Sequence, residues 1–146
     1  MSCIPQIEMV VLAGDMNGHV GSSNVGYDGT HGGFGYGAKN SDGSSILEFT
    51  DGLNLVICNT LFMKQESQLV TYVAGFVKST VDYIIIWQDK AKVCNVKVIP
   101  NEECIPKHKL LVMYMQFITS KKFKPRVRVW KLHEEQTSGI QKHGQR

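Results

Sequence analysis

The chain has 146 residues, 42% of them hydrophobic, and a formal net charge of +3, which suits one domain with a core that needs no disulfide or metal staple. No apolar run approaches the ~20 residues of a membrane span, and the first residues lack the basic region and long apolar core of a signal peptide. Because Cys3, Cys58, Cys94 and Cys104 show no CxxC spacing, we expect reduced thiols in a nuclear or cytoplasmic, non-secreted protein without a zinc site. We expect Cys58 and Cys94 to be buried in strands.

Charge is distributed unevenly along the chain. Up to Ser120 there are 8 Lys/Arg against 11 Asp/Glu, and from Lys121 onward there are 8 against 2. We therefore predict a domain over residues 1–118 and a basic tail or linker over residues 119–146. Basic side chains interleaved with aromatic ones suit phosphate contacts and base stacking, which makes five residues candidates for nucleic-acid contacts: Lys121, Lys122, Lys124, Arg126 and Arg128.

The first half of the chain predicts a strand, a long loop and a helix. Residues 8–13 form an apolar run that does not alternate, which indicates a strand buried on both faces. Residues 14–43 are rich in Gly, Asn, Ser and Asp, and so long a loop usually belongs to a functional site or is disordered. Ile46, Phe49 and Leu53 then recur at helical spacing, with Ser44 or Ser45 as the predicted N-cap.

The second half is predicted to consist mainly of strands. One helix among about six strands predicts an α/β fold with a strand-dominated second half. The short stretch 74–78 predicts a hairpin between the two strands that it joins. The strands predicted after the helix cover residues 55–60, 69–73, 79–87, 92–99 and 109–117.

Four polar residues stand at or inside apolar runs. Asp15 and Asn17 follow the first strand, and Asp82 is a lone carboxylate within "TVDYIIIW", where burial costs several kcal/mol unless the charge is paired or binds a metal. His108 precedes the last predicted strand. A turn, a polar strand end or an exposed histidine would explain each of them singly. Together they suit a Mg²⁺ site with oxygen ligands and a histidine that contacts phosphate, as in metal-assisted phosphodiester hydrolysis.

The order of short motifs carries a family resemblance. "GDMN", "NTLF", "TY", "VDYI" and "PKH" occur in this order between residues 10 and 117. This region resembles the carboxyl-terminal half of the endonuclease/exonuclease/phosphatase family, most closely the endonucleases of non-LTR retrotransposons and the host proteins similar to craniofacial development protein 2. The resemblance implies a two-sheet α/β sandwich that cuts nucleic acid, above all DNA, with Mg²⁺ or Mn²⁺ and without a membrane partner.

The resemblance also assigns roles to individual residues. Asp15 and Asn17 match the GD-x-N motif and would provide the catalytic carboxylate, the phosphate-orienting amide and the metal site. Asp82 would orient His108, which would contact the scissile phosphate. Two further residues would lie on the strand that lines the DNA cleft, namely Thr71 and Tyr72.

Two departures from the family pattern affect the expected activity. The family's terminal S-D-H motif reads "PKH", with Lys107 where a metal-site aspartate stands, and a cation there should repel Mg²⁺. The family's amino-terminal asparagine and metal-binding glutamate have no match in residues 1–9. We therefore expect an amino-terminally truncated domain with one sheet largely absent, impaired activity, and a separate chain or domain as the candidate source of the missing half.

Two other interpretations of the function stay open. One is a catalytically inactive nucleic-acid-binding protein that relies on the basic segment. The other is a retroelement remnant without a biochemical role, which would expose apolar sheet surface. A nucleotide cofactor is not expected, because "GGFGYG" (residues 32–37) neither follows a predicted strand nor opens a predicted helix.

Overall fold

The computed structural model describes residues 10–87, 92–119 and 122–130, with side chains up to residue 116. The helical elements in this part of the chain are α1 (Ser41–Gly52) and two short 3₁₀ helices, η1 (Cys58–Thr60) and η2 (Glu66–Gln68). The strands are β1 (Val11–Asp15), β2 (Leu55–Ile57), β3 (Tyr72–Ala74), β4 (Val77–Ser79), β5 (Asp82–Trp87), β6 (Val93–Ile105), β7 (His108–Thr119) and β8 (Lys122–Trp130).

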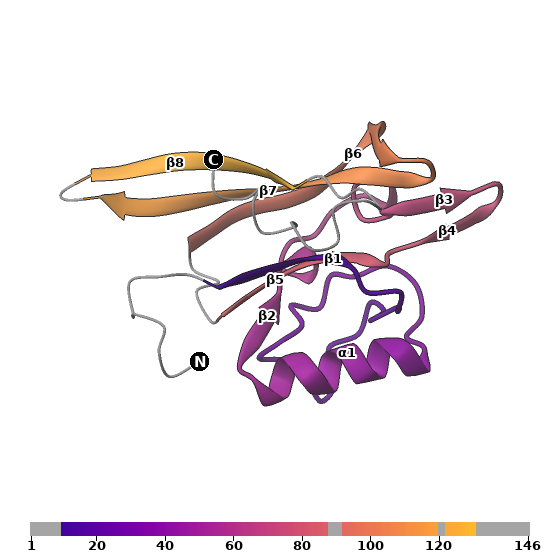
Figure 1. The fold of residues 1–146 in the computed structure, drawn as a ribbon. Coiled ribbons are helices and arrows are strands. Elements are labelled where there is room, and N and C mark those ends of the chain that lie inside the picture. Colours follow the sequence, from indigo (N-terminus) through magenta and orange to yellow (C-terminus); the bar gives the residue numbers. More distant parts are fainter. Residues whose placement is uncertain (1–9, 88–91, 120–121, 131–146) are drawn as a thin grey trace.

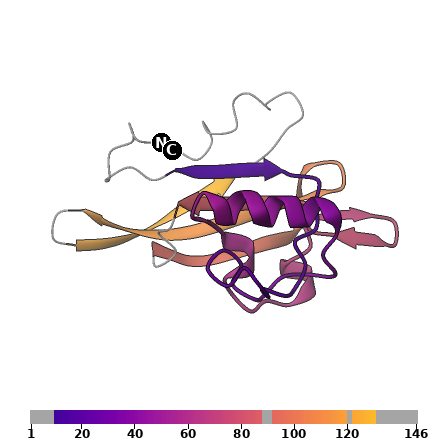
Figure 2. The same ribbon diagram turned by 90° about the horizontal axis from the view of Figure 1, so that it is seen from below.

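The strands form two antiparallel sheets in a sandwich-like arrangement (Figure 1). The first sheet has the order β1-β5-β2, and the second has the order β4-β3-β7-β6, with β8 also paired to β7. Helix α1 lies on the face of the first sheet that points away from the second sheet (Figures 1 and 2). The expectation that one sheet would be largely absent is therefore wrong, because both sheets form within the described residues.

Strand β5 is the centre of the molecule because both of its faces are covered. Ile84 and Ile86 belong to the core between the sheets, while Tyr83 and Ile85 belong to the core beneath α1. Alternate residues of a strand point to opposite faces, so a strand buried on both sides needs apolar residues at successive positions. This packing explains the uninterrupted apolar run that follows Asp82.

Helix α1 confirms the predicted helix but begins earlier than its predicted cap. The side chain of Asn40, rather than Ser44 or Ser45, caps it, because Asn40 Oδ1 accepts the Gly43 N–H at 2.8 Å. The same oxygen accepts the His19 N–H at 3.0 Å. A Cβ at Gly43 would overlap the His19 carbonyl oxygen, so the helix and the loop meet where only glycine fits.

Three predicted strands are shorter or displaced in the structure. The run at 55–60 is β2 followed by η1, and the run at 69–73 reaches strand geometry only at β3. The predicted hairpin exists, but its second strand is β4, which pairs with β3. The predicted strand at 79–87 is divided, because the chain leaves the second sheet after Ser79 and enters the first at Asp82.

The basic segment contributes a strand rather than only a tail. Backbone pairing joins β8 to β7 from Leu111↔Trp130 to Thr119↔Lys122, so this segment extends the second sheet across residue 118.

The two cysteines predicted to be buried differ in exposure. Cys58 is buried as predicted, although it lies in η1 rather than in a strand, whereas Cys94 on β6 is exposed, so the predicted burial of Cys94 is wrong. None of the helices described is long and apolar enough to span a bilayer.

Candidate functional site

The structure brings together three of the four predicted polar residues. Asp15 ends β1 and is paired in register with Asp82, the first residue of β5, while His108 is the first residue of β7. The His108 Nδ1 lies 2.9 Å from Asp82 Oδ2, and its Nε2 lies 3.9 Å from Asp15 Oδ2. One ligand atom from each residue falls within 4.8 Å of the others. We call these three residues the Asp15–Asp82–His108 cluster.

The three side chains of the cluster range from buried to exposed. The side chain of Asp82 is 5% exposed, that of His108 15% and that of Asp15 46%. Burial raises the pKa of Asp82, and the nearby Asp15 charge raises it further. The hydrogen bond and charge of His108 and the hydrogen bond from Thr71 act in the opposite direction on that pKa. The cluster thus holds one desolvated carboxyl group and one that water or a ligand can reach.

The raised pKa of Asp82 predicts how its replacement affects stability. The folded state binds the Asp82 proton more tightly than the unfolded state does, so stability is lost as the pH rises from the ordinary value of 3.8 through the folded pKa. We expect Asp82→Asn to be more stable than the unaltered chain at about pH 8, with the difference shrinking toward about pH 4. Urea unfolding across this range measures the difference. A gap independent of pH, or an equal gap in the exposed Asp28→Asn, would contradict it.

The two residues predicted to line a DNA cleft have different positions. Thr71 is fully buried, which leaves its side chain no surface to offer a nucleic acid. Its hydroxyl instead accepts the N–H groups of Val81 and Asp82 at 3.0 and 3.2 Å. Tyr72 is half-buried at the site, and its ring meets that of His108 edge-on with centroids 5.0 Å apart. Thr71 therefore positions the start of β5, and its place on a strand that lines a DNA cleft stays a prediction.

Asn17 lies beside the cluster in a left-handed backbone conformation, with φ at 47°. Its N–H donates to Asp15 Oδ1 at 2.9 Å, a bond that turns the chain sharply after β1. The side chain lines an open hollow against α1. The Asn17 side chain thus lies toward α1, and its role in metal and phosphate binding stays a prediction.

Lys107 occupies the turn between β6 and β7, with φ at 74°. Its N–H donates to Glu103 Oε2 at 3.0 Å, and its carbonyl accepts the Val73 N–H at 2.9 Å. These bonds fix the backbone immediately before His108. The side chain is exposed and directly precedes His108 in the chain.

Two buried side chains that sequence reasoning left out of the site hold it in place. The Asn59 amide donates to the Asp82 carbonyl and accepts the Ile84 N–H, both at 3.0 Å. The Tyr83 hydroxyl bonds with the carbonyls of Gly18 at 2.7 Å and Thr80 at 2.8 Å and accepts the Val20 N–H at 3.2 Å. Asn59 lies in the "NTLF" motif, which is the sequence feature that could have identified it as part of the site.

The predicted basic contacts fall largely outside the described side chains. Lys121 lies outside the described residues. The other four occupy alternate positions of β8, whose backbone alone is described: Lys122, Lys124, Arg126 and Arg128. Their contact with nucleic acid stays a prediction.

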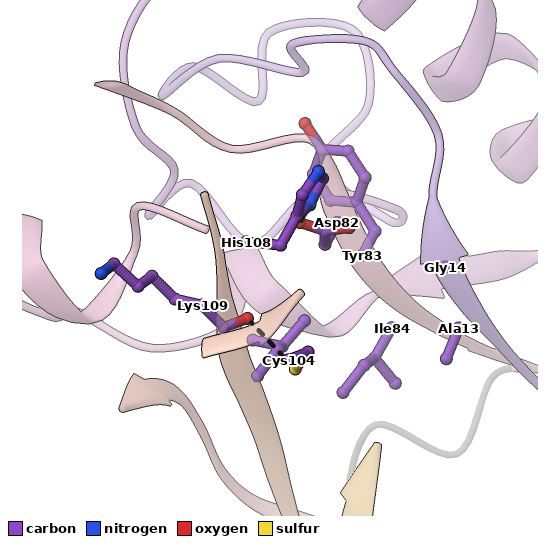
Figure 3. A pocket seen from close by; sticks show the side chains of 9 residues that line it. Ala13, Gly14, Asp82, Tyr83, Ile84, Cys104, His108 and Lys109 are labelled. Carbon is purple, nitrogen blue, oxygen red and sulfur yellow. Dashed lines mark hydrogen bonds and ion pairs between the residues drawn. The ribbon is translucent and has the colours of Figure 1, made fainter. Parts of the chain in front are cut away.

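A narrow cavity of about 10 Å³ opens between the sheets beside the cluster, large enough for roughly one water molecule. Figure 3 shows Asp82 and His108 on one side of it, and Cys104 beside the backbone of Lys109. The Lys109 ammonium points away from Asp82 (Figure 3). The cavity is too small for a substrate.

Comparison with known proteins identifies a homologue. Craniofacial development protein 2 of Bos taurus is 36% identical over 111 residues, which cover 74% of this chain and 18% of that protein. The chain is homologous to craniofacial development protein 2. The Tragulus javanicus protein is 35% identical over 111 residues, with 74% of this chain and 19% of that protein covered. The chain therefore spans about a fifth of the length of these relatives.

The family-model comparison returned no match. No solved structure matches the chain either. The assignment of this craniofacial development protein 2 homologue to the endonuclease/exonuclease/phosphatase family, and of its sandwich to that family's fold, is therefore a proposal.

The chemistry of the cluster suits a divalent cation. Two carboxylates and an imidazole provide ligand atoms within 4.8 Å of one another, and oxygen-rich sets of this kind suit Mg²⁺ or Mn²⁺. Asp82 already engages the Nδ1 of His108, so Asp15 and the Nε2 of His108 are the groups with room for a ligand.

Proposed function

We propose that the chain carries a divalent-metal-dependent phosphodiester hydrolase site of the endonuclease/exonuclease/phosphatase type. In this proposal it is part of a DNA endonuclease domain of retrotransposon origin, and Lys107 impairs its activity. The observation that carries the proposal is the convergence of Asp15, Asp82 and His108 from three strands. All three are among the four catalytic residues that the family motifs select from the sequence, the fourth being Asn17.

The proposed mechanism assigns one task to each side chain. Bound Mg²⁺ or Mn²⁺ would stabilise the negative charge that develops on the phosphate. Asp15, the exposed member, would hold the metal together with the adjacent Asn17 amide, which would orient a phosphate oxygen. Asp82 accepts from Nδ1 of His108 and thereby aims Nε2 outward, where it can meet the scissile phosphate.

The proposal includes a second contributor to the site. In the family that the motifs resemble, a metal-binding glutamate and an asparagine come from the amino-terminal half. We propose that another segment or chain supplies these groups, as the greater length of the homologues allows. Without them, Asp15 and Asn17 would bind the metal weakly.

Metal binding provides the direct test. We expect weak Mn²⁺ binding by the unaltered chain, measured by electron paramagnetic resonance, to fall about tenfold or more in Asp15→Ala because the exposed metal ligand is lost. The exposed Asp28→Ala is the matched control and should bind as before. With Mg²⁺, the unaltered chain should leave supercoiled DNA intact.

The outcomes separate the parts of the proposal. Equal Mn²⁺ binding by the unaltered chain and Asp15→Ala would overturn the metal site. Strong nicking by the unaltered chain that disappears in Asp15→Ala would uphold the hydrolase but refute the role given to Lys107.

A catalytically inactive nucleic-acid-binding protein is the second candidate function. It is favoured by the basic segment, because β8 extends the second sheet with a strand that carries Lys122, Lys124, Arg126 and Arg128. Salt-sensitive DNA binding without Mn²⁺ binding at the cluster would favour this function over the hydrolase.

A further inference from the structure

An open hollow of about 380 Å³ lies beside Asp15, between the loop that follows β1 and helix α1. Three apolar side chains line it, from Met16, Ile46 and Phe49, and three polar ones, from Asn17, Asp42 and Ser45. We call it the α1 hollow. Its size falls within the range of small-ligand sites in proteins.

The apolar wall of the α1 hollow contains an exposed aromatic ring. Helix α1 buries Gly43, Leu47 and Thr50, so the contact with the first sheet does not cover Phe49, which is 54% exposed. Such a ring is available as a stacking platform, and every nucleobase has a flat face that can stack on it.

The polar rim of the hollow selects among possible ligands. Among the described residues, neither the Asn17 amide nor the Asp42 carboxylate has a side-chain hydrogen-bond partner. The negative charge of Asp42 disfavours a phosphate in the hollow. A carboxylate does accept the exocyclic amino group of a base, as with the N4 amino group of cytosine.

We infer that the α1 hollow is a subsite for a nucleobase with an exocyclic amino group, stacked on Phe49 and recognised by Asp42. The inference rests on the proposed function, in which a phosphate binds at Asp15, because Met16 and Asn17 follow Asp15 directly in the chain and line the hollow. It adds a preference for amino-bearing bases such as cytosine over thymine.

Nucleotide titration without metal tests the subsite. We expect deoxycytidine 5′-monophosphate to shift the backbone amide NMR signals of Asn17, Ile46 and Phe49, and thymidine 5′-monophosphate to bind several-fold more weakly. Phe49→Ala should weaken deoxycytidine monophosphate binding by about fivefold or more, since the stacking surface is lost. Asp42→Asn should reduce the preference for cytosine over thymine.

The controls make each result decisive. Leu53→Ala removes a side chain of similar exposure, 45%, from the end of the same helix but outside the hollow, and it should bind as the unaltered chain does. Equal effects of Phe49→Ala and Leu53→Ala, or the same signal shifts with inorganic phosphate alone, would overturn the subsite. Base binding without Mn²⁺ binding would uphold the subsite and refute the hydrolase, whereas Mn²⁺ binding without base binding would do the reverse.

Discussion

Lys107→Asp is expected to strengthen Mn²⁺ binding at the Asp15–Asp82–His108 cluster by about tenfold or more. The substitution changes the local charge by two units directly before His108, and it restores the residue type that the family motif has there. Because the turn already presents this side chain to solvent, the change costs no burial. Electron paramagnetic resonance of Mn²⁺ measures the gain, and nicking of supercoiled DNA tests whether activity rises with it.

Lys109→Asp is the matched control for this prediction. It makes the same charge change on the other side of His108, but its ammonium points away from Asp82 (Figure 3), so it should raise Mn²⁺ affinity much less. High salt should reduce the effect of both substitutions, since exposed charges are screened. Equal gains in the two variants would mean that net charge, rather than the position of Lys107, controls the affinity.

The elements that could be predicted are those whose formation depends on residues close together in the sequence. The α1 helix and the buried run of β5 follow from apolar spacing alone, which is why both were found in the sequence. The division between β4 and β5 could not be predicted, because it depends on Thr71, whose hydroxyl accepts the N–H groups of Val81 and Asp82. That contact joins residues distant in sequence, and no local pattern encodes it.

The N-cap residue of α1 could not be predicted either, because it too depends on a contact between residues distant in sequence. Ser44 and Ser45 are good N-cap residues by type, yet Asn40 caps the helix because its oxygen also accepts the His19 N–H. A side chain that accepts hydrogen bonds from both the loop and the helix thus outweighed the local preference for serine.

The number of strands was underestimated for a related reason. The basic composition of β8 does not indicate that it pairs with β7.

The residues of the candidate site could be predicted from their types, but the buried side chains that hold them in place could not. Asp82 could be selected because a carboxylate in an apolar run needs a partner, whereas His108 stood out only together with the other polar residues and the family motifs. Thr71 was expected on the strand that lines a DNA cleft, and its complete burial could not be predicted because it depends on contacts with β5. Asn59 was not assigned to the site, because its hydrogen bonds to Asp82 and Ile84 join residues distant in sequence.

Asn59→Ala is expected to lower the free energy of unfolding by roughly 2–4 kcal/mol, because it leaves two buried backbone groups without partners. The amide of Asn59 serves both the Asp82 carbonyl and the Ile84 N–H, and thus replaces a neighbouring strand at the point where β2 ends. Urea unfolding measures the loss. The exposed Asn101→Ala is the control and should change stability little.

The same substitution connects stability with the site. Asp82 lies at the start of β5, where the Asn59 side chain and the Thr71 hydroxyl hold its backbone. Loosening this backbone should broaden the NMR signals of the His108 ring, since Asp82 fixes that ring through Nδ1. A loss no greater than that of Asn101→Ala would show that water satisfies both backbone groups. The Asn59 amide would then be dispensable for placing Asp82.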